Sequence, residues 1–372
     1  MRDTMNRLRD LKSWLADSVR WRHRVLIALG LLVSAASVSV LRVYQTVHTP
    51  WKHTYANRVF NVSQGVTSKQ IYNQLLENSL LPASMKVKLW FRIKASTNTL
   101  KAGDYLFPSP IAPATVIEKL IRGDVHHQFI TLPEGLNRIE VAHLIQTLNL
   151  RDADKSLELT ENPDLINLIK DLDPQATTLE GYLFPDTYQY ISTTTAPQLM
   201  ANMIRRFRQV FTPALQRRAE ELGMSARQVI TLASMIELEA RLADERPLVS
   251  SVYHNRLRLG MKLDCDPTVI YASRLAGKWT GTIRQSDLRR DSPYNTYLRA
   301  GLPPGPVASP GRASIEAALY PADTDHLYFV VDATRDDGAH RFSARFKLHQ
   351  SNVALYRLAQ RRRAKQTQTV TP

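Results

Sequence analysis

The chain has 372 residues, of which 44% are hydrophobic, and it carries a formal net charge of +15. This length accommodates two folded domains, and a content of 20 prolines and 14 glycines excludes a low-complexity protein. The single cysteine, Cys265, excludes an intramolecular disulfide and a cysteine-based zinc site, and the histidines show no metal spacing, so no metal and no cofactor is predicted. The charge favours an anionic partner: nucleic acid, an acidic membrane leaflet or an acidic wall polymer.

The first 44 residues combine a basic leader with an apolar run. Residues 1–24 contain seven Arg or Lys side chains against three Asp, and residues 25–41 are uncharged, with Val43 and Tyr44 available to extend the run. A bilayer span needs about 17–25 such residues, and cationic flanks stay on the cytoplasmic side. The sequence predicts a cytoplasmic leader (1–24) and a transmembrane helix (25–44), which sends the remaining chain across the membrane. A signal peptide cleaved among the small residues 34–39 is the alternative.

A small α+β module is predicted after a linker at residues 45–57. Hydrophobic periodicity and turn residues indicate two strands and three helices within residues 58–125. The strands are expected at 59–62 and 103–107, and the helices at 68–77 with Ser68 as cap, 86–93, and 114–122 ended by Gly123. A unit of this kind serves as a binding module or as a spacer.

A larger mixed α/β domain is predicted at residues 126–362, followed by a loose tail at 363–372, so the fold class of the chain is α+β. Three stretches are expected to be loops because they are rich in turn or hydrogen-bonding residues: 180–188, 263–271 and 291–297. The proline-rich segment 301–311 is also expected to lack regular structure. Strands are predicted at 128–132 and 327–331, and helices at 138–148, 198–221, from 227 onward with Ser225 as cap, 247–259 and 348–363.

The helix that begins at Arg227 carries the first candidate for chemistry. Val229, Ile230, Ala233 and Ile236 recur at helical spacing and form an apolar stripe. At about 100° per residue, Glu237 projects from within this stripe. Apolar surroundings raise the pKa of a carboxyl group, as a general acid near neutral pH requires. A salt-bridged structural glutamate is the alternative, and Glu239, at the margin of the stripe, is the weaker candidate.

Seven motifs together resemble the YceG-like (MltG) family of endolytic murein transglycosylases, membrane-anchored enzymes that cut peptidoglycan glycan strands. The resemblance covers nearly the whole chain and implies an anchor, a LysM-like small module and a catalytic domain. The motifs are Leu-Pro-Glu-Gly (132–135), Glu-Gly-Tyr-Leu-Phe-Pro-Asp-Thr-Tyr (180–188), Leu-Ala-Ser-Met-Ile-Glu-Leu-Glu (232–239), Asn-Arg-Leu (255–257), Asp-Pro-Thr-Val-Ile-Tyr (266–271), Ser-Pro-Tyr-Asn-Thr-Tyr (292–297) and Gly-Leu-Pro-Pro-Gly-Pro (301–306). The sequence departs from the family pattern at Leu238, where a lysine is usual, and at Asp264-Cys265.

The resemblance implies that Glu237 is the catalytic residue. It would protonate the oxygen between N-acetylmuramic acid and N-acetylglucosamine, and its carboxylate would then take the proton of the attacking 6-hydroxyl, which leaves a 1,6-anhydro end. A glycosidase that uses water would need a second carboxylate, for which Asp266, Glu239 and Asp186 are available. Supporting or substrate-binding roles are expected for Glu239, Asn255, Asp266, Thr268, Tyr271, Tyr294, Asn295, Thr296, Glu180 and Tyr182.

The expected function is endolytic cleavage of nascent glycan strands, which would terminate their elongation. The expected partners are peptidoglycan glycan strands, the cytoplasmic membrane and peptidoglycan synthases. A tethered peptidoglycan-binding scaffold without activity and a muramidase-type hydrolase are the alternatives. No nucleic-acid partner is expected, because the basic residues are dispersed and the anchor would place them outside the cytoplasm.

Overall fold

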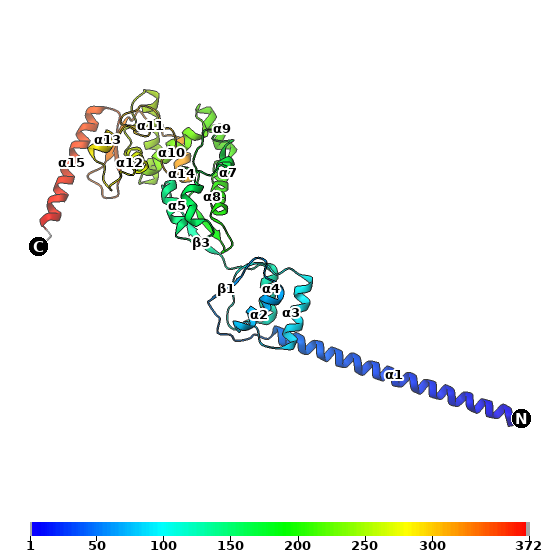
Figure 1. The fold of residues 1–372 in the computed structure, drawn as a ribbon. Coiled ribbons are helices and arrows are strands. Elements are labelled where there is room, and N and C mark those ends of the chain that lie inside the picture. Colours follow the sequence, from blue (N-terminus) through cyan, green and yellow to red (C-terminus); the bar gives the residue numbers. More distant parts are fainter. Residues whose placement is uncertain (1, 370–372) are drawn as a thin grey trace. The chain divides into compact units, whose positions relative to one another are not determined.

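The computed structural model describes residues 2–369, with side chains for residues 21–362, and divides the chain into two units. The N-terminal unit is Met1–His127 and the C-terminal unit is Gln128–Pro372. Each unit has a hydrophobic core of its own and combines helices with strands, as predicted (Figure 1). In the described residues the strands form three antiparallel pairs.

A single long helix, α1 (Arg2–His48), opens the N-terminal unit. Its segment Trp21–His48 is long and apolar enough to cross a membrane, and the predicted span 25–44 lies inside it. The helix continues into the segment expected to be a linker, and the side chain of Val47 is buried in the core of the unit. Trp51 then pairs with Ile111 through backbone hydrogen bonds in both directions. Residues 45–57 are therefore largely part of the folded unit.

The rest of the N-terminal unit has the order strand, helix, helix, strand, helix. Strand β1 (Val59–Val62) pairs antiparallel with β2 (Gly103–Leu106), and the helices are α2 (Ser68–Glu77), α3 (Met85–Thr97) and α4 (Pro113–Arg122). The cap of α2 is Thr67 and not Ser68, because the Thr67 hydroxyl accepts from the Gln70 amide while the Gln70 side chain accepts from the Thr67 amide. Gly123 ends α4 in the left-handed region, as expected.

The C-terminal unit begins with strand β3 (Gln128–Thr131), which pairs with β4 (Thr187–Tyr190). Between them lie α5 (Arg138–Gln146), α6 (Ser156–Leu159), α7 (Pro163–Ile166) and two short 3₁₀ helices, η1 (Ala153–Lys155) and η2 (Asn167–Ile169). The basic tract predicted as one helix forms two, α8 (Ala196–Val210) and α9 (Pro213–Glu221). Pro213 explains the break, because proline is compatible only with the first turn of a helix.

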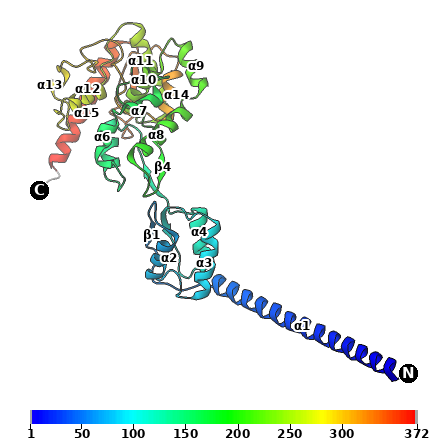
Figure 2. The ribbon, with the colours of Figure 1, turned by 45° about the vertical axis from the view of Figure 1, so that its right-hand side comes forward.

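Helix α10 (Ala226–Glu239) lies at the centre of the C-terminal unit, and residues 229–236 are buried on every side. It begins at the predicted cap, Ser225, whose hydroxyl accepts from the Gln228 amide. Helices α9, α11 (Arg246–Arg258), α12 (Asp266–Leu275) and α14 (Arg312–Leu319) pack against it, and the 3₁₀ helix η3 (Ala243–Glu245) precedes α11 (Figure 2). The helix that carries Glu237 is therefore enclosed by other helices over most of its length.

The C-terminal part of the unit departs most from the prediction. Residues 266–271 begin α12 and are not a loop, because Pro267 starts the helix in its first turn. Helices α13 (Gln285–Leu288) and α14 and strand β6 (His340–Ser343), which pairs with β5 (Tyr328–Val331), were not predicted. Helix α15 (Phe346–Thr369) extends through most of the expected loose tail, and the end of that tail, 370–372, lies outside the described residues.

Candidate active site

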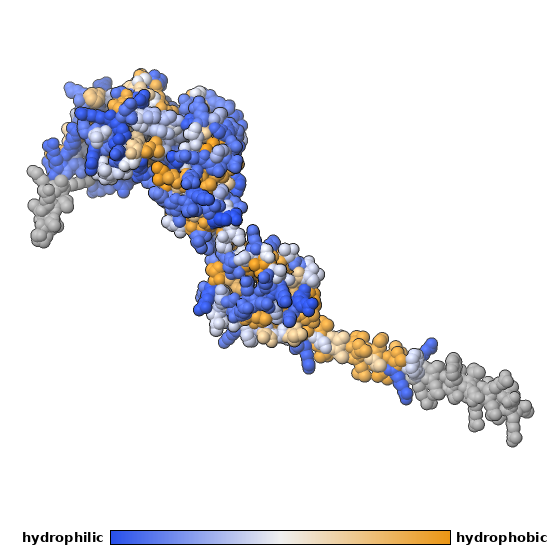
Figure 3. Space-filling view, in the orientation of Figure 1, coloured by the Kyte–Doolittle hydropathy of each residue, from blue (hydrophilic) through white to orange (hydrophobic). Residues whose placement is uncertain are grey.

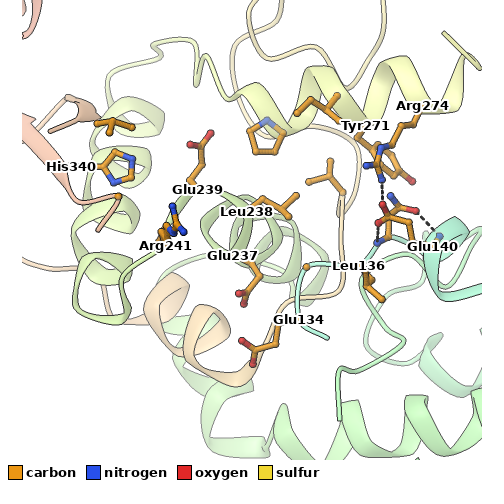
Figure 4. Close-up of a pocket in the computed structure, with 18 residues that line it drawn as sticks. Glu134, Leu136, Glu140, Glu237, Leu238, Glu239, Arg241, Tyr271, Arg274 and His340 are labelled. Atoms are coloured by element: carbon orange, nitrogen blue, oxygen red, sulfur yellow. Dashed lines mark hydrogen bonds and ion pairs between the residues drawn. The ribbon is translucent and has the colours of Figure 1, made fainter. Parts of the chain in front are cut away.

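A cavity of about 760 Å³ opens at the C-terminal end of α10. Its walls come from five separated parts of the chain: the turn before α5 with the start of that helix, the end of α10, α12, the proline-rich segment at Val307, and the β5–β6 pair. Its lining includes carboxylates and cations at Glu134, Glu140, Glu237, Glu239, Arg241 and Arg274, as well as Tyr271 and His340 (Figure 4). A cavity of this size can hold an extended ligand, and it offers both acids and cations to it.

The Glu237 side chain lies in the wall of this cavity and is only 7% exposed. Its Oε2 accepts a hydrogen bond of 2.9 Å from the Gly311 amide. Its Oε1 lies 3.6 Å from Nη2 of Arg246, which is positioned in turn by a hydrogen bond from Nε to Ser314 Oγ. The carboxyl group is therefore fixed in one orientation at the cavity wall while remaining open to it.

Glu134, from the Leu-Pro-Glu-Gly motif, is the second acid at this point. Its side chain and that of Glu237 point toward the same space in Figure 4. Partial burial and the charge of Glu237 raise the pKa of Glu134, and Arg246 acts in the opposite direction. A Cβ atom on Gly311 would lie 1.9 Å from Glu134 Oε1, so only glycine fits between the two acids. Sequence analysis did not single out Glu134, although its motif was recognised.

Backbone contacts fix the segments that carry these groups. The Gly135 amide donates to the Ser309 carbonyl, and the Ser309 amide donates to the Leu136 carbonyl. The proline-rich segment is joined to α10 where the Val307 amide donates to Ser234 Oγ, at 3.1 Å. Irregular segments are thus positioned against the central helix by direct hydrogen bonds, which gives the site a fixed geometry.

Glu239 lies at the other side of the cavity and points away from the Glu134–Glu237 pair (Figure 4). Burial raises the pKa of Glu239 to about 7, and the charge of Asp266 acts in the same direction, while hydrogen bonds from Cys265 and the Asp266 backbone oppose both. Asp266 itself is exposed, and its Oδ1 accepts a bond of 2.6 Å from the Tyr297 hydroxyl. Glu239 therefore takes up a proton near neutral pH without facing Glu237.

His340 enters the cavity wall from β6. Its Nδ1 lies 2.7 Å from Glu245 Oε2, and its backbone amide donates to Glu245 Oε1 at 2.7 Å. This double contact fixes the imidazole and connects the β5–β6 pair to η3. In the sequence, His340 is one of several scattered histidines. No local pattern indicates that Glu245, which is distant in the chain, contacts it.

Tyr271 lines the cavity from α12 and connects it to a buried acid behind it. The Tyr271 hydroxyl donates to Glu180 Oε2 at 2.8 Å, and the ring packs edge-on against Tyr294, with centroids 4.9 Å apart. Burial raises the pKa of Glu180 to about 7, although hydrogen bonds from Tyr271 and the Arg138 amide lower it. Glu180 and Tyr294 thus support Tyr271 from behind the cavity wall.

The other predicted residues lie outside the cavity lining, and their polar groups are occupied by structural bonds. Asn255 donates to the Thr324 and His326 carbonyls, and Asn295 donates to the Leu288 and Arg290 carbonyls. The Tyr182 hydroxyl donates to Asp173 at 2.7 Å. Thr296 Oγ1 accepts from the Cys265 amide and lies 2.9 Å from Thr268 Oγ1, so this pair fixes the start of α12.

The chemistry available at the site is that of acids and bases. Of the eleven residues predicted for the site, Glu237, Glu239 and Tyr271 line the cavity, and Glu134, Glu140, Arg241, Arg274 and His340 join them. Arg274 is paired with Glu140, which also completes the cap of α5 through the Asn137 amide. Within the part of the chain that the structure describes, no group of three or more His, Cys, Asp or Glu side chains is arranged to bind a metal ion.

Comparison with known sequences and structures relates this chain to one family. The profile of the YceG-like family matches residues 60–355. An endolytic murein transglycosylase of Bacillus subtilis is 30% identical over 301 residues, which cover 78% of this chain and 82% of that protein. One from Streptococcus pneumoniae serotype 2 is 27% identical over 319 residues, which cover 79% of this chain and 57% of that protein.

A solved structure agrees with these sequence matches. The crystal structure of a putative YceG-like protein from Listeria monocytogenes is 30% identical in sequence and matches with a TM-score of 0.54, over 79% of this chain and 97% of that chain. The family match spans both units and every motif from Leu132 to Pro306. From this coverage we conclude that the chain belongs to the YceG-like family.

Proposed function

We propose that this protein is a peptidoglycan lytic transglycosylase whose catalytic residue is Glu237. The observation that supports this proposal is a nearly buried carboxyl group, oriented by the Gly311 amide and Arg246, in the wall of a cavity large enough for a few sugar rings. The relatives named endolytic murein transglycosylases support the same reaction class. The substrate would be glycan strands of peptidoglycan, cut between N-acetylmuramic acid and N-acetylglucosamine.

In the proposed reaction a single carboxyl group serves twice. Protonated Glu237 gives its proton to the bridging oxygen as the bond from that oxygen to the anomeric carbon of N-acetylmuramic acid breaks. The carboxylate then removes the proton of the 6-hydroxyl of the same sugar, whose oxygen bonds to the anomeric carbon. The proton returns to Glu237, no water is consumed, and the product has a 1,6-anhydro end.

Glu134 and Tyr271 are the residues of the cavity proposed to support this step. A carboxylate at Glu134 would stabilise the positive charge that develops on the sugar ring, because opposite charges attract strongly where water is excluded. Tyr271, supported by Glu180 and Tyr294, would contact the glycan from the α12 side. The buried Asn255, Asn295, Thr268 and Thr296 are proposed to act indirectly, by fixing the segments around the cavity.

The N-terminal unit is proposed to anchor and position the enzyme. Its segment Trp21–His48 would cross the cytoplasmic membrane once with the basic leader inside, so that both folded units lie outside the cytoplasm. The strand–helix–helix–strand order of residues 59–106 supports a LysM-like module. This arrangement suits an enzyme that cuts nascent strands beside peptidoglycan synthases. Such cutting would terminate the elongation of those strands.

The test is mass analysis of purified peptidoglycan after digestion by the wild-type protein and by Glu237→Gln. We expect fragments with anhydro ends from the wild type and a loss of at least about 10³-fold in rate for the variant, because the proton donor is removed. Glu220→Gln, an exposed change on α9, is the matched control and should cleave normally. Reducing muramyl ends would establish a hydrolase instead, and an inactive wild type would favour the scaffold.

A further inference from the structure

Helix α3 of the N-terminal unit presents an apolar row to solvent. Met85, Leu89 and Ile93 are 79%, 53% and 52% exposed, and their spacing of four residues places them on one face of the helix. The opposite face carries Val87 and Phe91, which are buried in the core of the unit. Folding of the unit therefore uses one side of α3 and leaves the apolar row uncovered.

Cations flank this row on both sides. Helix α3 contains Lys86, Lys88, Arg92 and Lys94 and no acidic residue. At about 100° per residue, Lys88 and Arg92 lie along one margin of the row and Lys86 lies along the other. Nζ of Lys94 stands 5.1 Å from the ring centre of Trp90, a half-buried aromatic residue. An apolar row edged by cations and an aromatic ring is typical of a helix that lies in a membrane interface.

The structure places α3 directly beside the end of the membrane-span segment. Helices α1 and α3 pack together, and the rings of His48 and Trp90 are 6.0 Å apart (Figure 1). The apolar run of α1 ends at Tyr44, and the four residues from Tyr44 to His48 lengthen the helix by about 6 Å. This length equals the thickness of one polar layer of a bilayer, about 5–7 Å, so the contact with α3 falls at the depth of the headgroups. Figure 3 shows hydrophobic colour continuing from α1 onto the adjoining edge of the unit.

We propose that α3 lies in the headgroup layer of the membrane that α1 spans, with Met85, Leu89 and Ile93 inserted and its cations bound to anionic phospholipid headgroups. The inference rests on the proposed anchoring by α1. Long cationic side chains reach the phosphates while the apolar side chains enter the acyl boundary. This second attachment fixes the rotation of the N-terminal unit about α1, which a single helix would leave free.

The experiment uses the full chain, with Cys265→Ala, reconstituted into phosphatidylcholine vesicles containing phosphatidylglycerol. An environment-sensitive fluorophore is attached to one introduced cysteine: Leu89→Cys on α3, Asn73→Cys on the exposed face of α2, or Val33→Cys in the middle of the apolar run. Phospholipids spin-labelled close to the headgroup or deep in the acyl chain serve as quenchers. We expect the shallow label to quench the Leu89 probe at least about threefold more than the Asn73 probe, because only α3 would lie at that depth.

The three positions separate the inference from the anchor on which it rests. Quenching of the Val33 probe by the deep label together with equal, weak quenching at Leu89 and Asn73 would overturn the interfacial position of α3 and leave the anchor intact. Weak quenching at Val33 would overturn the anchor and the inference together. Equal, strong quenching at Leu89 and Asn73 would show general adsorption of the unit and would also contradict the inference.

The charge contribution is tested by replacing Lys86, Lys88, Arg92 and Lys94 with glutamine in the Leu89→Cys protein. We expect quenching at Leu89 to fall by at least about half in vesicles with phosphatidylglycerol and to lose its dependence on the anionic lipid. Lys69→Gln, an exposed lysine of α2, is the matched control. If quenching at Leu89 does not change with the anionic lipid or with the substitutions, the proposed binding to headgroups is contradicted.

Discussion

Glu134 and Glu237 form the carboxyl pair on which the proposed reaction depends. Gly311 separates them: its amide donates to Glu237, and its missing side chain leaves room for Glu134. Partial burial and the charge of Glu237 raise the pKa of Glu134. Glu134 therefore keeps its proton to a higher pH than a fully solvated glutamate does.

Glu134→Gln is therefore expected to lower the rate and to change the acid side of its pH profile. Protonation of a carboxylate that stabilises the charged sugar ring lowers kcat/KM as the pH falls through the raised pKa of Glu134, and the glutamine variant, which has no such group, should lack this decrease. The measurement is the rate of glycan cleavage between pH 4.5 and 8.5. A uniform loss of rate with an unchanged acid limb would show that Glu134 only positions the substrate.

Gly311→Ala provides an independent control for the same pair. The added Cβ would collide with the end of the flexible Glu134 side chain and displace it, without touching buried backbone. The rate of this variant should fall while its melting temperature stays near that of the wild type. Combined with Glu134→Gln, the glycine substitution should add little further loss, since both changes remove the same carboxylate.

At the scale of elements, the buried Glu180 joins the start of α5 to α12 through the Arg138 amide and the Tyr271 hydroxyl. Its pKa is raised to about 7 by burial, so the folded state binds a proton that the unfolded chain releases near pH 4.5. The stability that this proton confers is fully present below about pH 4.5 and is lost as the pH rises through about 7. Glu239, whose pKa is also raised to about 7, acts in the same direction.

Glu180→Gln should flatten this dependence. We expect the melting temperature of the wild-type C-terminal unit to fall between pH 5 and pH 8 by a few degrees more than that of the variant, which corresponds to roughly 1–3 kcal/mol. The measurement is thermal unfolding at fixed ionic strength across that range. Parallel curves for the two proteins would mean that Glu180 stays ionised in the folded state.

The helix α10 and its glutamate could be predicted because their signals are local. The apolar spacing of residues 229–236, the cap Ser225 and the inward position of Glu237 all follow from 3.6-residue periodicity, and the structure has each of them. The pattern Asp266-Pro-Thr predicts a turn, whereas the structure has the start of α12 there, because proline is also favoured in the first turn of a helix.

The remaining parts of the site depend on contacts that a single sequence does not display. The position of Glu134 depends on the space that Gly311 leaves, and the orientation of His340 depends on its contact with Glu245. Both partners are distant in the chain. Strand β6 is short and mixes His340 and Arg341 with Phe342, so it has no clear alternation. Asn255 and Asn295, expected near the glycan, are bound to backbone carbonyls that the sequence could not identify.

At the scale of the whole molecule, the two units have separate hydrophobic cores and the cavity is lined only by residues of the C-terminal unit. We therefore expect residues 128–372, produced alone, to fold and to cleave soluble glycan fragments with a kcat/KM within about threefold of the full chain. The same fragment should not sediment with vesicles, because α1 and α3 are missing. Loss of cleavage by a folded fragment would show that the N-terminal unit contributes to the reaction itself.

The distribution of the cavity walls along the chain has a consequence for the timing of activity. Glu134 comes early in the C-terminal unit, Glu237 in its middle and His340 close to its end. During synthesis the cavity cannot be completed until β6 has emerged from the ribosome. A chain that stopped before β6 would carry the proposed membrane anchor without a complete cavity, so it could not carry out the proposed cleavage of the wall.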